Sequence, residues 1–357
     1  MAQPLVKIKG RGAVSNPANR FERIDFEPDP ESAAENPGPR TQFFRDSTRT
    51  VIASNDSPDV GFDYSVNSYR GCEHGCIYCY ARPTHEYFGL SAGLDFETKI
   101  FVKEDAPELL RRELSSPRWK PAVIAMSGVT DPYQPVERRL KLTRRCLEVL
   151  SEFGNPVQVI TKNQLVARDA DVLGEMARFG AAAVALSITS LDQSLQRQME
   201  PRTSAPAARL AAVAALAEAG VPVSVMVAPV IPGLNDHEVP AILKAAAEAG
   251  ARSAAYIPLR LPWSVKALFE EWLTTHFPDR TTRVLGRIRG IRGGALNDPR
   301  FGSRMEGEGE YAEQIQALFQ VSAQKYGLSG ERARLSVEGW KGPSAPASGK
   351  QTQLSLF

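Results

Sequence analysis

The sequence predicts an α/β protein in which six β/α units form a partial barrel, (β/α)6. Short apolar runs rich in β-branched residues alternate with longer runs of helical periodicity between about residue 62 and residue 275. Such alternation is typical of a parallel sheet whose strands are connected by helices. A hydrophobic content of 43% in 357 residues is sufficient for one large core. In such a barrel we expect the chemistry in the loops that follow the strands.

The expected elements follow one another at spacings that suit β/α units. The expected strands cover residues 62–69, 122–126, 157–161, 183–188, 222–228 and 253–258. The expected helices cover residues 106–114, 137–153, 167–179, 206–219, 239–249 and 265–275, with a further amphipathic helix at about 311–326.

Composition divides the chain into four regions. Residues 1–60 are rich in Pro, Asn, Asp, Glu and Arg and have little periodicity, so we expect an extended, partly disordered N-terminal arm. The barrel is predicted over residues 61–280 and a C-terminal helical extension over 281–338. Residues 339–357 contain a Gly/Pro/Ser/Ala linker that is too small and polar to bury a core, which predicts a flexible tail.

Charge and cysteine content narrow the class of protein. The net charge of +2 gives no global basic field of the kind that would by itself indicate a nucleic-acid binder. Four cysteines, three of them clustered, do not make a disulfide framework and suit a metal site in a reducing compartment. The start of the chain lacks the apolar core of a signal peptide, and no run of about 18 apolar residues occurs. We expect a cytoplasmic protein without a membrane span.

The most specific motif is the cysteine run GCEHGCIYCY. Its spacing, C-x3-C-x2-C, is typical of a loop that holds three irons of a [4Fe–4S] cluster and leaves the fourth iron open to a substrate or cofactor. The expected metal ligands are Cys72, Cys76 and Cys79. Gly71 and Gly75 suit a loop whose backbone wraps closely around such a cluster.

A structural zinc site is the plainer interpretation of the same loop. Zinc requires four ligands, commonly in two pairs, and only His74, His85 or the distant Cys146 is available to complete the set. No second ligand pair occurs. Cys146 lies on a helical pattern of apolar residues, where a free cysteine usually packs in the core.

Five runs of the sequence resemble the radical S-adenosylmethionine (radical SAM) superfamily, and within it the branch that includes spore photoproduct lyase. The runs are NSYRGCEHGCIYCYARPT, MSGVTDPYQPVERRLKLTRRCLEVL, VITKNQLVARDADVL, LSITSLDQSLQRQMEPRTSAPAARLAAVAALAEAG and VMVAPVIPGLND, and the resemblance covers about residues 60–330. It implies a radical SAM barrel with a [4Fe–4S] cluster and S-adenosylmethionine as cofactors. It also implies reductive cleavage of S-adenosylmethionine to methionine and a 5′-deoxyadenosyl radical, which removes a hydrogen atom from the substrate.

The resemblance also implies cofactor contacts at the ends of the strands. The matching positions are Ser127, Gly128, Thr130 and Asp131 for the methionine amino group, Lys162 for the carboxylate, Ser187 and Thr189 for the ribose or carboxylate, and Val230 for the adenine. The usual Gly-Gly-Glu of the family is absent from the first of these runs. An Asp-Pro turn, a solvated strand-end lysine and a simple loop would produce the same residues.

Two tyrosines are catalytic candidates by the same resemblance. Tyr78 and Tyr80 match two tyrosines that relay a hydrogen atom in the lyase branch, although packing around the cluster would also place them here. In that branch a cysteine near the second strand end donates the hydrogen to the product. Met126, Ser127 and Gly128 include no cysteine, so the hydrogen donor remains unassigned.

The chain ends in QLSLF, which resembles the bacterial sliding-clamp-binding peptide. The expected partner-binding residues are Gln353, Leu354, Leu356 and Phe357. The amide of Gln353 offers hydrogen bonds and the apolar side chains would fill a pocket, while the linker lets the tip reach a partner. A tip that docks on the barrel is the alternative.

These observations predict a radical SAM enzyme, a lyase or a related radical transformation, that acts on nucleic acid in a DNA-repair-like role. The expected partners are a DNA substrate, the sliding clamp and a reductant such as flavodoxin or ferredoxin. One alternative is radical SAM modification of RNA, a protein or a small metabolite. A second alternative is a non-catalytic metal-binding module.

Overall fold

A computed structural model describes residues 8–21, 39–330 and 333–343. In this part of the chain the main sheet has the order β10-β9-β8-β7-β6-β3-β2. Six strands pair in parallel, namely β3 (Tyr64–Val66), β6 (Ile124–Met126), β7 (Val157–Thr161), β8 (Ala182–Ser187), β9 (Val223–Val230) and β10 (Ser253–Pro258). The edge strand β2 (Ile52–Ser54) pairs antiparallel with β3. The predicted partial (β/α)6 barrel is confirmed.

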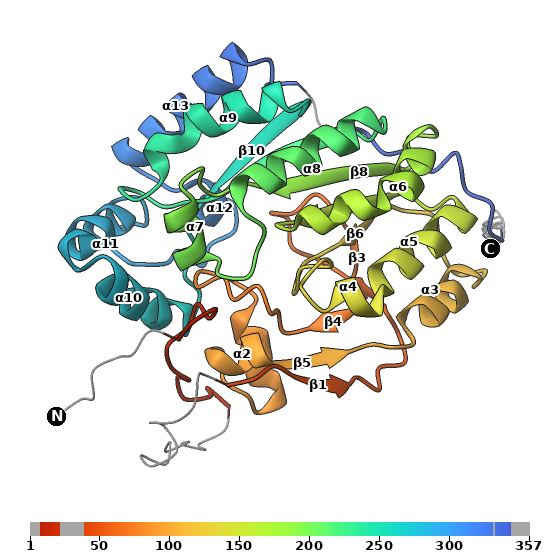
Figure 1. Ribbon diagram of the computed structural model, residues 1–357, viewed down its shortest axis with the longest axis horizontal. Coiled ribbons are helices and arrows are strands. Elements are labelled where there is room, and N and C mark those ends of the chain that lie inside the picture. Colours follow the sequence, from red (N-terminus) through yellow and green to blue (C-terminus); the bar gives the residue numbers. More distant parts are fainter. Residues whose placement is uncertain (1–7, 22–38, 331–332, 344–357) are drawn as a thin grey trace, which may run out of the picture.

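Helices cover the outer face of this sheet in chain order (Figure 1). Each contacts the next in the series α3 (Ala106–Leu114), α5 (Leu142–Phe153), α6 (Ala170–Ala177), α8 (Pro206–Glu218), α9 (Val239–Glu248) and α13 (Glu310–Lys325). The main core lies between these helices and the sheet, where Leu147, Val184 and Ile242 are buried. Every residue of β8 is buried, which is why the parallel strands appear as continuous apolar runs in the sequence.

The helix predicted over residues 137–153 is two helices. The short α4 (Glu137–Leu140) ends at Lys141, whose φ of 54° is left-handed, and α5 follows. Apolar periodicity continues through this break, so the pattern did not reveal it. The helix predicted from residue 167 likewise starts with a 3₁₀ turn, η2 (Gln164–Asp169), before α6.

The N-terminal arm contributes strands to both sheets. β1 (Gln42–Arg45) pairs in parallel with β5 (Lys99–Val102), and β5 pairs antiparallel with β4 (Tyr69–Arg70) in a second, smaller sheet. Both β1 and β2 are short and largely exposed, so they lack the apolar alternation by which strands are recognised. The described residues of the arm are extended, and they belong to the folded domain because β1 and β2 pair with its strands.

The remaining elements close the barrel mouth, which is the side where the parallel strands end. They are η1 (Arg82–Phe88), α2 (Leu94–Thr98), α7 (Gln193–Met199), η3 (Asp236–Glu238), α10 (Val265–His276), η4 (Pro278–Arg280), α11 (Thr281–Gly290) and α12 (Ser303–Glu306). A second apolar cluster joins α7, α10 and α11 to the cysteine loop through Ile77 and Tyr78.

The predicted flexible tail starts at residue 339, but its first residues pack on the barrel. The Trp340 ring lies 5.7 Å from the ring of Phe153, and the backbone N–H of Lys341 donates to the Phe153 carbonyl. A large aromatic side chain at this position explains the packing. The predicted clamp-binding residues Gln353, Leu354, Leu356 and Phe357 lie outside the described residues.

Candidate active site

The cysteine loop follows β4 and is hydrogen-bonded to loops at the ends of the barrel strands. After β6, the Thr130 hydroxyl and the Gln134 amide both donate to the Gly71 carbonyl, at 3.0 and 3.2 Å. Beyond β8, the carbonyl of Met199 accepts from the Ile77 backbone N–H at 3.0 Å. The three cysteines are therefore held at the barrel mouth, where the sequence predicted them.

A buried ion pair holds the loop from beneath. Arg82 and Glu97 are 2.5 Å apart, and neither side chain is exposed. The Arg82 guanidinium also donates to the carbonyls of Cys76 and Gly75, at 2.9 and 3.1 Å. The Glu97 carboxylate accepts from the backbone N–H groups of residues 12 and 13. One ion pair thus connects the N-terminal arm, α2 and the cysteine loop.

Gly71 and Gly75 occupy positions that a side chain would not fit. Their φ angles are 76° and 67°, in the left-handed region. A Cβ on Gly71 would lie 2.8 Å from the ring of His85, and a Cβ on Gly75 would lie 2.7 Å from the Glu97 carboxylate. The atoms that exclude a side chain at both glycines are protein groups beneath the loop, and the close wrapping around a cluster stays a prediction.

The three thiols form a donor set suited to an iron–sulfur cluster. Burial and the nearby charge of Glu200 raise the pKa of Cys76 well above its usual value, and burial and the charge of Cys72 raise that of Cys79 to about 11. Neighbouring thiolates repel one another. The cysteines therefore need a bound metal cation in order to ionise together.

Three thiols on one loop match the ligand number of a [4Fe–4S] cluster that leaves its fourth iron open. A [4Fe–4S] cluster offers a different iron to each thiolate, so its ligands need not converge on one point. The donor set therefore fits the cluster predicted from the spacing.

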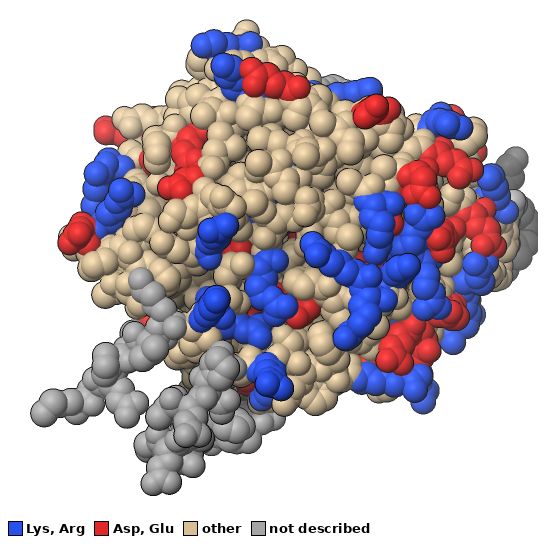
Figure 2. Space-filling view, in the orientation of Figure 1, with Lys and Arg blue, Asp and Glu red and all other residues tan. Residues whose placement is uncertain are grey.

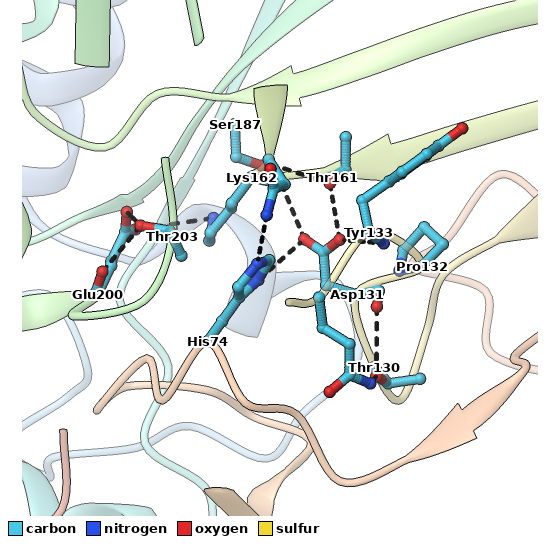
Figure 3. Close-up of polar contacts among 12 residues, drawn as sticks. His74, Thr130, Asp131, Pro132, Tyr133, Thr161, Lys162, Ser187, Glu200 and Thr203 are labelled. Carbon is cyan, nitrogen blue, oxygen red and sulfur yellow. Dashed lines mark hydrogen bonds and ion pairs between the residues drawn. The ribbon is translucent and has the colours of Figure 1, made fainter. Parts of the chain in front are cut away.

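Asp131 connects the ends of β6 and β7 (Figure 3). One carboxylate oxygen accepts from the Thr161 hydroxyl at 2.6 Å and from the backbone N–H of Tyr133 at 2.9 Å. The other accepts from the backbone N–H of Lys162 at 2.8 Å and lies 3.4 Å from Nδ1 of His74. Protein groups occupy both oxygens, so Asp131 orders the loops around the site.

His74 joins the cysteine loop to this carboxylate. Its Nε2 lies 3.1 Å from the side-chain amide nitrogen of Asn163, which follows β7. Burial disfavours the charged ring, but Asp131 and Cys72 favour it and raise the pKa of His74 to about 10. The same contact contributes to a lowered pKa for Asp131. The loop is thereby fixed to the ends of both β6 and β7.

Glu200 is the centre of a second polar network. Its fully buried carboxylate accepts hydrogen bonds from the hydroxyls of Tyr78 and Thr189 and pairs with Arg209. Burial raises its pKa, but the charges of Arg209 and Lys162 and the two hydroxyl donors outweigh burial and lower the pKa to about 2. The ionised carboxylate ties the cysteine loop to the end of β8.

Lys162 lies between this network and the barrel mouth. Its ammonium donates to the Ala228 carbonyl at 3.0 Å and lies 3.9 Å from the Glu200 carboxylate. The side chain remains partly exposed, so the ammonium has donors left for a ligand. The side chain of Ser187 is buried nearby. The backbone carbonyl of Ser187 accepts a hydrogen bond from the Arg209 guanidinium.

The structure brings only part of the predicted cofactor set to an accessible position. Ser127 and Gly128 are partly exposed after β6, whereas Thr130 is buried beneath the cysteine loop. Val230 is fully buried in the main core. Val230 was predicted to contact the adenine only because residues 229–233 resemble the segment of the family that lies against it.

The two tyrosines differ in their surroundings. Tyr78 is buried and hydrogen-bonded to Glu200. Tyr80 is 53% exposed, donates to the Gly128 carbonyl at 2.8 Å, and has the Arg260 guanidinium 6.0 Å from its ring. Of the pair, Tyr80 is the one whose ring is accessible at the mouth.

Several residues of this site escaped sequence reasoning. They are Glu73, Arg82, Glu97, Asn163, Glu200, Arg202 and Arg209, all of which hold the cysteine loop or the strand ends in place. They share a charged or amide side chain, and several of their partners are distant in sequence, up to 122 residues for Glu200 and Tyr78. Pairing at such separation follows from the fold alone. Cys146 packs in the main core, as predicted.

Comparison with known proteins agrees with this geometry. Residues 66–246 match the family model of the radical SAM superfamily. An uncharacterized protein of Mycobacterium tuberculosis is 39% identical over 224 residues, which are 62% of this chain and 66% of that protein. An uncharacterized protein of Methanocaldococcus jannaschii is 31% identical over 178 residues, or 50% of this chain and 64% of that protein. The chain thus spans just under two thirds of the length of these relatives.

Solved structures share the fold. Spore photoproduct lyase complexed with dinucleoside spore photoproduct superposes with a TM-score of 0.55 at 18% identity, covering 80% of this chain and 79% of that chain. A spore photoproduct lyase mutant with bound AdoMet and the same dinucleoside has a TM-score of 0.52 at 17% identity, covering 80% and 78%. At this level of identity the likeness concerns the fold.

Proposed function

This chain belongs to the radical SAM superfamily, and we propose that it is a radical SAM enzyme that acts on nucleic acid. Its cofactors are a [4Fe–4S] cluster and S-adenosylmethionine. The observation that carries the proposal is the position of Cys72, Cys76 and Cys79, whose loop is fixed to the ends of the barrel strands. When bound, the cluster supplies the electron that cleaves S-adenosylmethionine to methionine and a 5′-deoxyadenosyl radical.

The chain's own residues would hold and orient these groups. Cys72, Cys76 and Cys79 are the cluster ligands in this proposal. The partly exposed ammonium of Lys162 suits the carboxylate of S-adenosylmethionine, because lysine acts as a compact point charge. The accessible positions Ser127 and Gly128 are the remaining candidates after β6. Thr130, Asp131, Ser187 and Thr189 then act by ordering the loops around the ligand, and the burial of Val230 argues against an adenine contact.

Tyr80 is the proposed catalytic tyrosine. Its ring is exposed at the mouth, and its hydroxyl is oriented by the Gly128 carbonyl. Tyr78, by contrast, donates its hydroxyl to Glu200 and is best described as a positioning residue. A hydroxyl that meets the substrate could move a hydrogen atom, which suits a chain with no cysteine over residues 126–128.

The nucleic-acid substrate is supported by basic charge near the loop that follows β6. Lys and Arg side chains gather over α4 and α5 (Figure 2). Arg138, Arg139 and Lys141 are exposed there, directly after the loop that follows β6. A local basic surface beside the site supplies phosphate contacts although the net charge is only +2. The structural likeness to a lyase that binds a dinucleoside lesion favours a DNA-repair-like reaction over protein or metabolite modification.

Anaerobic turnover tests the activity. Reconstituted protein, dithionite and S-adenosylmethionine should give 5′-deoxyadenosine, and Ala at Cys72, Cys76 or Cys79 should abolish it. Deuterium from a labelled DNA lesion should appear in the 5′-deoxyadenosine. Label from RNA, a protein or a metabolite instead would replace the DNA assignment. A preparation that binds zinc and no acid-labile sulfide would support the non-catalytic module.

We also propose partners beyond the substrate. A flavodoxin or ferredoxin would supply the electron in a reducing cytoplasm, which suits four free cysteines. The sequence QLSLF favours a sliding clamp as a second partner. A pull-down on immobilised clamp with and without residues 353–357 tests this, and equal retention would remove the clamp. None of the described helices is long and apolar enough to span a membrane.

A further inference from the structure

We propose that an exposed ladder of three aromatic rings and one arginine beside the barrel mouth stacks against unpaired bases of the nucleic-acid substrate. The ladder consists of Tyr87, Phe21, Arg20 and Trp263, in that order. This inference rests on the proposed function, because it names the surface on which that substrate would lie. It adds a binding site away from the cysteines and from the strand-end residues.

The four side chains alternate as ring, ring, cation and ring. The rings of Tyr87 and Phe21 are stacked, with centroids 5.1 Å apart and planes 24° apart. The Arg20 guanidinium lies 5.0 Å from the Phe21 centroid on one side and 4.6 Å from the Trp263 ring on the other. Flat π faces and a guanidinium plane are the groups on which bases stack.

The rings of the ladder are exposed although they contact one another. Tyr87 is 70% exposed, Trp263 59% and Phe21 57%. A group of large, exposed apolar rings is uncommon on a protein surface and usually marks an interaction site. The three rings come from η1, the N-terminal arm and the loop after β10, so the fold assembles the ladder from three separate segments.

The ladder is held in place from below. Arg20 pairs at 2.6 Å with Glu86, whose side chain has no exposure. The Asn19 side chain donates to the carbonyls of Glu86 and Leu90, at 3.0 and 2.9 Å, and accepts from the backbone N–H of Phe21. A stacking platform that is already ordered loses little entropy when it binds.

The ladder is connected to the active site on two sides. Tyr87 lies at the end of η1, the turn that follows Tyr80 and the cysteine loop. Trp263 lies in the loop after β10, together with Arg260, whose guanidinium is 6.0 Å from the Tyr80 ring. Two of the three segments that form the ladder therefore continue into the surroundings of Tyr80.

Charge favours nucleic acid over an apolar protein segment as the occupant. Arg20 lies within the ladder, and Arg260, in the same loop as Trp263 and near the Tyr80 ring, is a second cation. The Nε of Arg260 is buried without a hydrogen-bond partner among the residues the structure describes. Glu86 pairs with the Nε of Arg20, and arginines interleaved with rings suit the bases and phosphates of a single strand better than an apolar peptide, which offers no acceptors.

Fluorescence anisotropy with a fluorescein-labelled single-stranded oligodeoxynucleotide tests the proposal without any turnover. Tyr87→Ala and Trp263→Ala should each weaken binding by about tenfold, the effect of one lost stacking contact. Trp263→Phe keeps an aromatic face and should bind nearly as tightly as the parent. Phe179→Ala is the matched control, because Phe179 is 65% exposed and precedes the amino end of β8, opposite the strand ends that carry the site. Its affinity should equal that of the parent.

Three results would overturn the ladder. The first is equal affinity of both Ala variants and the parent. The second is an oligonucleotide affinity that the Ala substitutions leave unchanged while protease cleavage within residues 22–38 changes. That result would mean that the rings bind this segment of the chain and not a nucleic acid. The third is tighter capture of an apolar peptide than of the oligonucleotide. If any of these occurs while 5′-deoxyadenosine still forms, the ladder fails and the radical SAM activity stands.

Discussion

Arg82 and Glu97 form an ion pair with no solvent exposure on either side, directly beneath the cysteine loop. Removing one member of such a pair leaves a buried charge without its partner, which costs about 3–5 kcal/mol. Arg82→Met should therefore lower the free energy of unfolding by roughly that amount and reduce the iron bound per chain. Urea unfolding of the metal-free protein and iron analysis of the reconstituted protein measure the two effects.

The matched control for this pair lies on the surface. Arg111 and Glu152 are also paired, but their side chains are 47% and 56% exposed. Exposed pairs contribute little, so Arg111→Met should change neither stability nor iron content appreciably. Equal effects of the two substitutions would show that the Arg82 pair has no special part in holding the loop.

Gly75→Ala tests the close contact of the loop with Glu97. The added Cβ would lie 2.7 Å from the Glu97 carboxylate, at a φ of 67°. Gly220 has a similar φ of 79° but has no atom within 4 Å of an added Cβ. Gly220→Ala therefore carries the backbone cost alone, about 1 kcal/mol, and should retain the cluster. Gly75→Ala should lose most of the iron, and equal iron in both variants would contradict this account.

Glu200 gives the fold a defined acid dependence. Its pKa is lowered to about 2 in the folded protein, against roughly 4.3 in an unfolded chain. A carboxylate with a lowered pKa stabilises the fold fully above the unfolded value, and the stabilisation is lost as the pH falls toward the folded value. The stability difference between parent and Glu200→Gln should thus shrink between about pH 4.5 and pH 2.

Urea unfolding at a series of pH values measures this difference. Glu148→Gln is the control, because Glu148 is 51% exposed and pairs with Arg144 at the surface. That variant should track the parent throughout. A stability difference for Glu200→Gln that stays constant from pH 7 to pH 2 would mean that folding does not change the pKa of Glu200.

Lys162→Met tests the proposed carboxylate contact. Loss of one charge-assisted hydrogen bond should weaken S-adenosylmethionine binding by roughly 10- to 100-fold. Equilibrium binding of labelled S-adenosylmethionine to the reconstituted protein measures it. Lys244→Met, on the outer helix α9 and 59% exposed, should bind as the parent does. If Lys162→Met binds S-adenosylmethionine as tightly as the parent, Lys162 does not contact the cofactor. Its role would then be the structural hydrogen bond to the Ala228 carbonyl.

The sequence alone predicted the barrel because buried parallel strands produce continuous apolar runs. The predicted bounds of β7 and β10 agree with the structure, and those of β8 differ by one residue at each end. The exposed strands β1 and β2 were missed, since nothing in their composition distinguishes them from an irregular arm. The break at Lys141 was missed because a left-handed residue leaves no trace in apolar periodicity.

The site was predictable only where its residues are close in sequence. The spacing of Cys72, Cys76 and Cys79 places them in one loop without knowledge of the fold. The networks around Asp131 and Glu200 join segments that only the barrel brings together, so the sequence offered the residues but not their partners. Asp131 shows the difference, because its sequence position made it a cofactor candidate, whereas its bonds to Thr161, Tyr133, Lys162 and His74 follow only from the fold.

Iron and sulfide analysis of anaerobically reconstituted protein tests the central claim most directly. Cys76→Ala should lose the cluster and its brown absorbance, because Cys76 belongs to the loop at the barrel mouth. Cys146→Ala should retain both, since Cys146 packs in the core on α5. A parent protein that takes up neither iron nor sulfide, or a Cys76→Ala variant that retains a full cluster, would contradict the account.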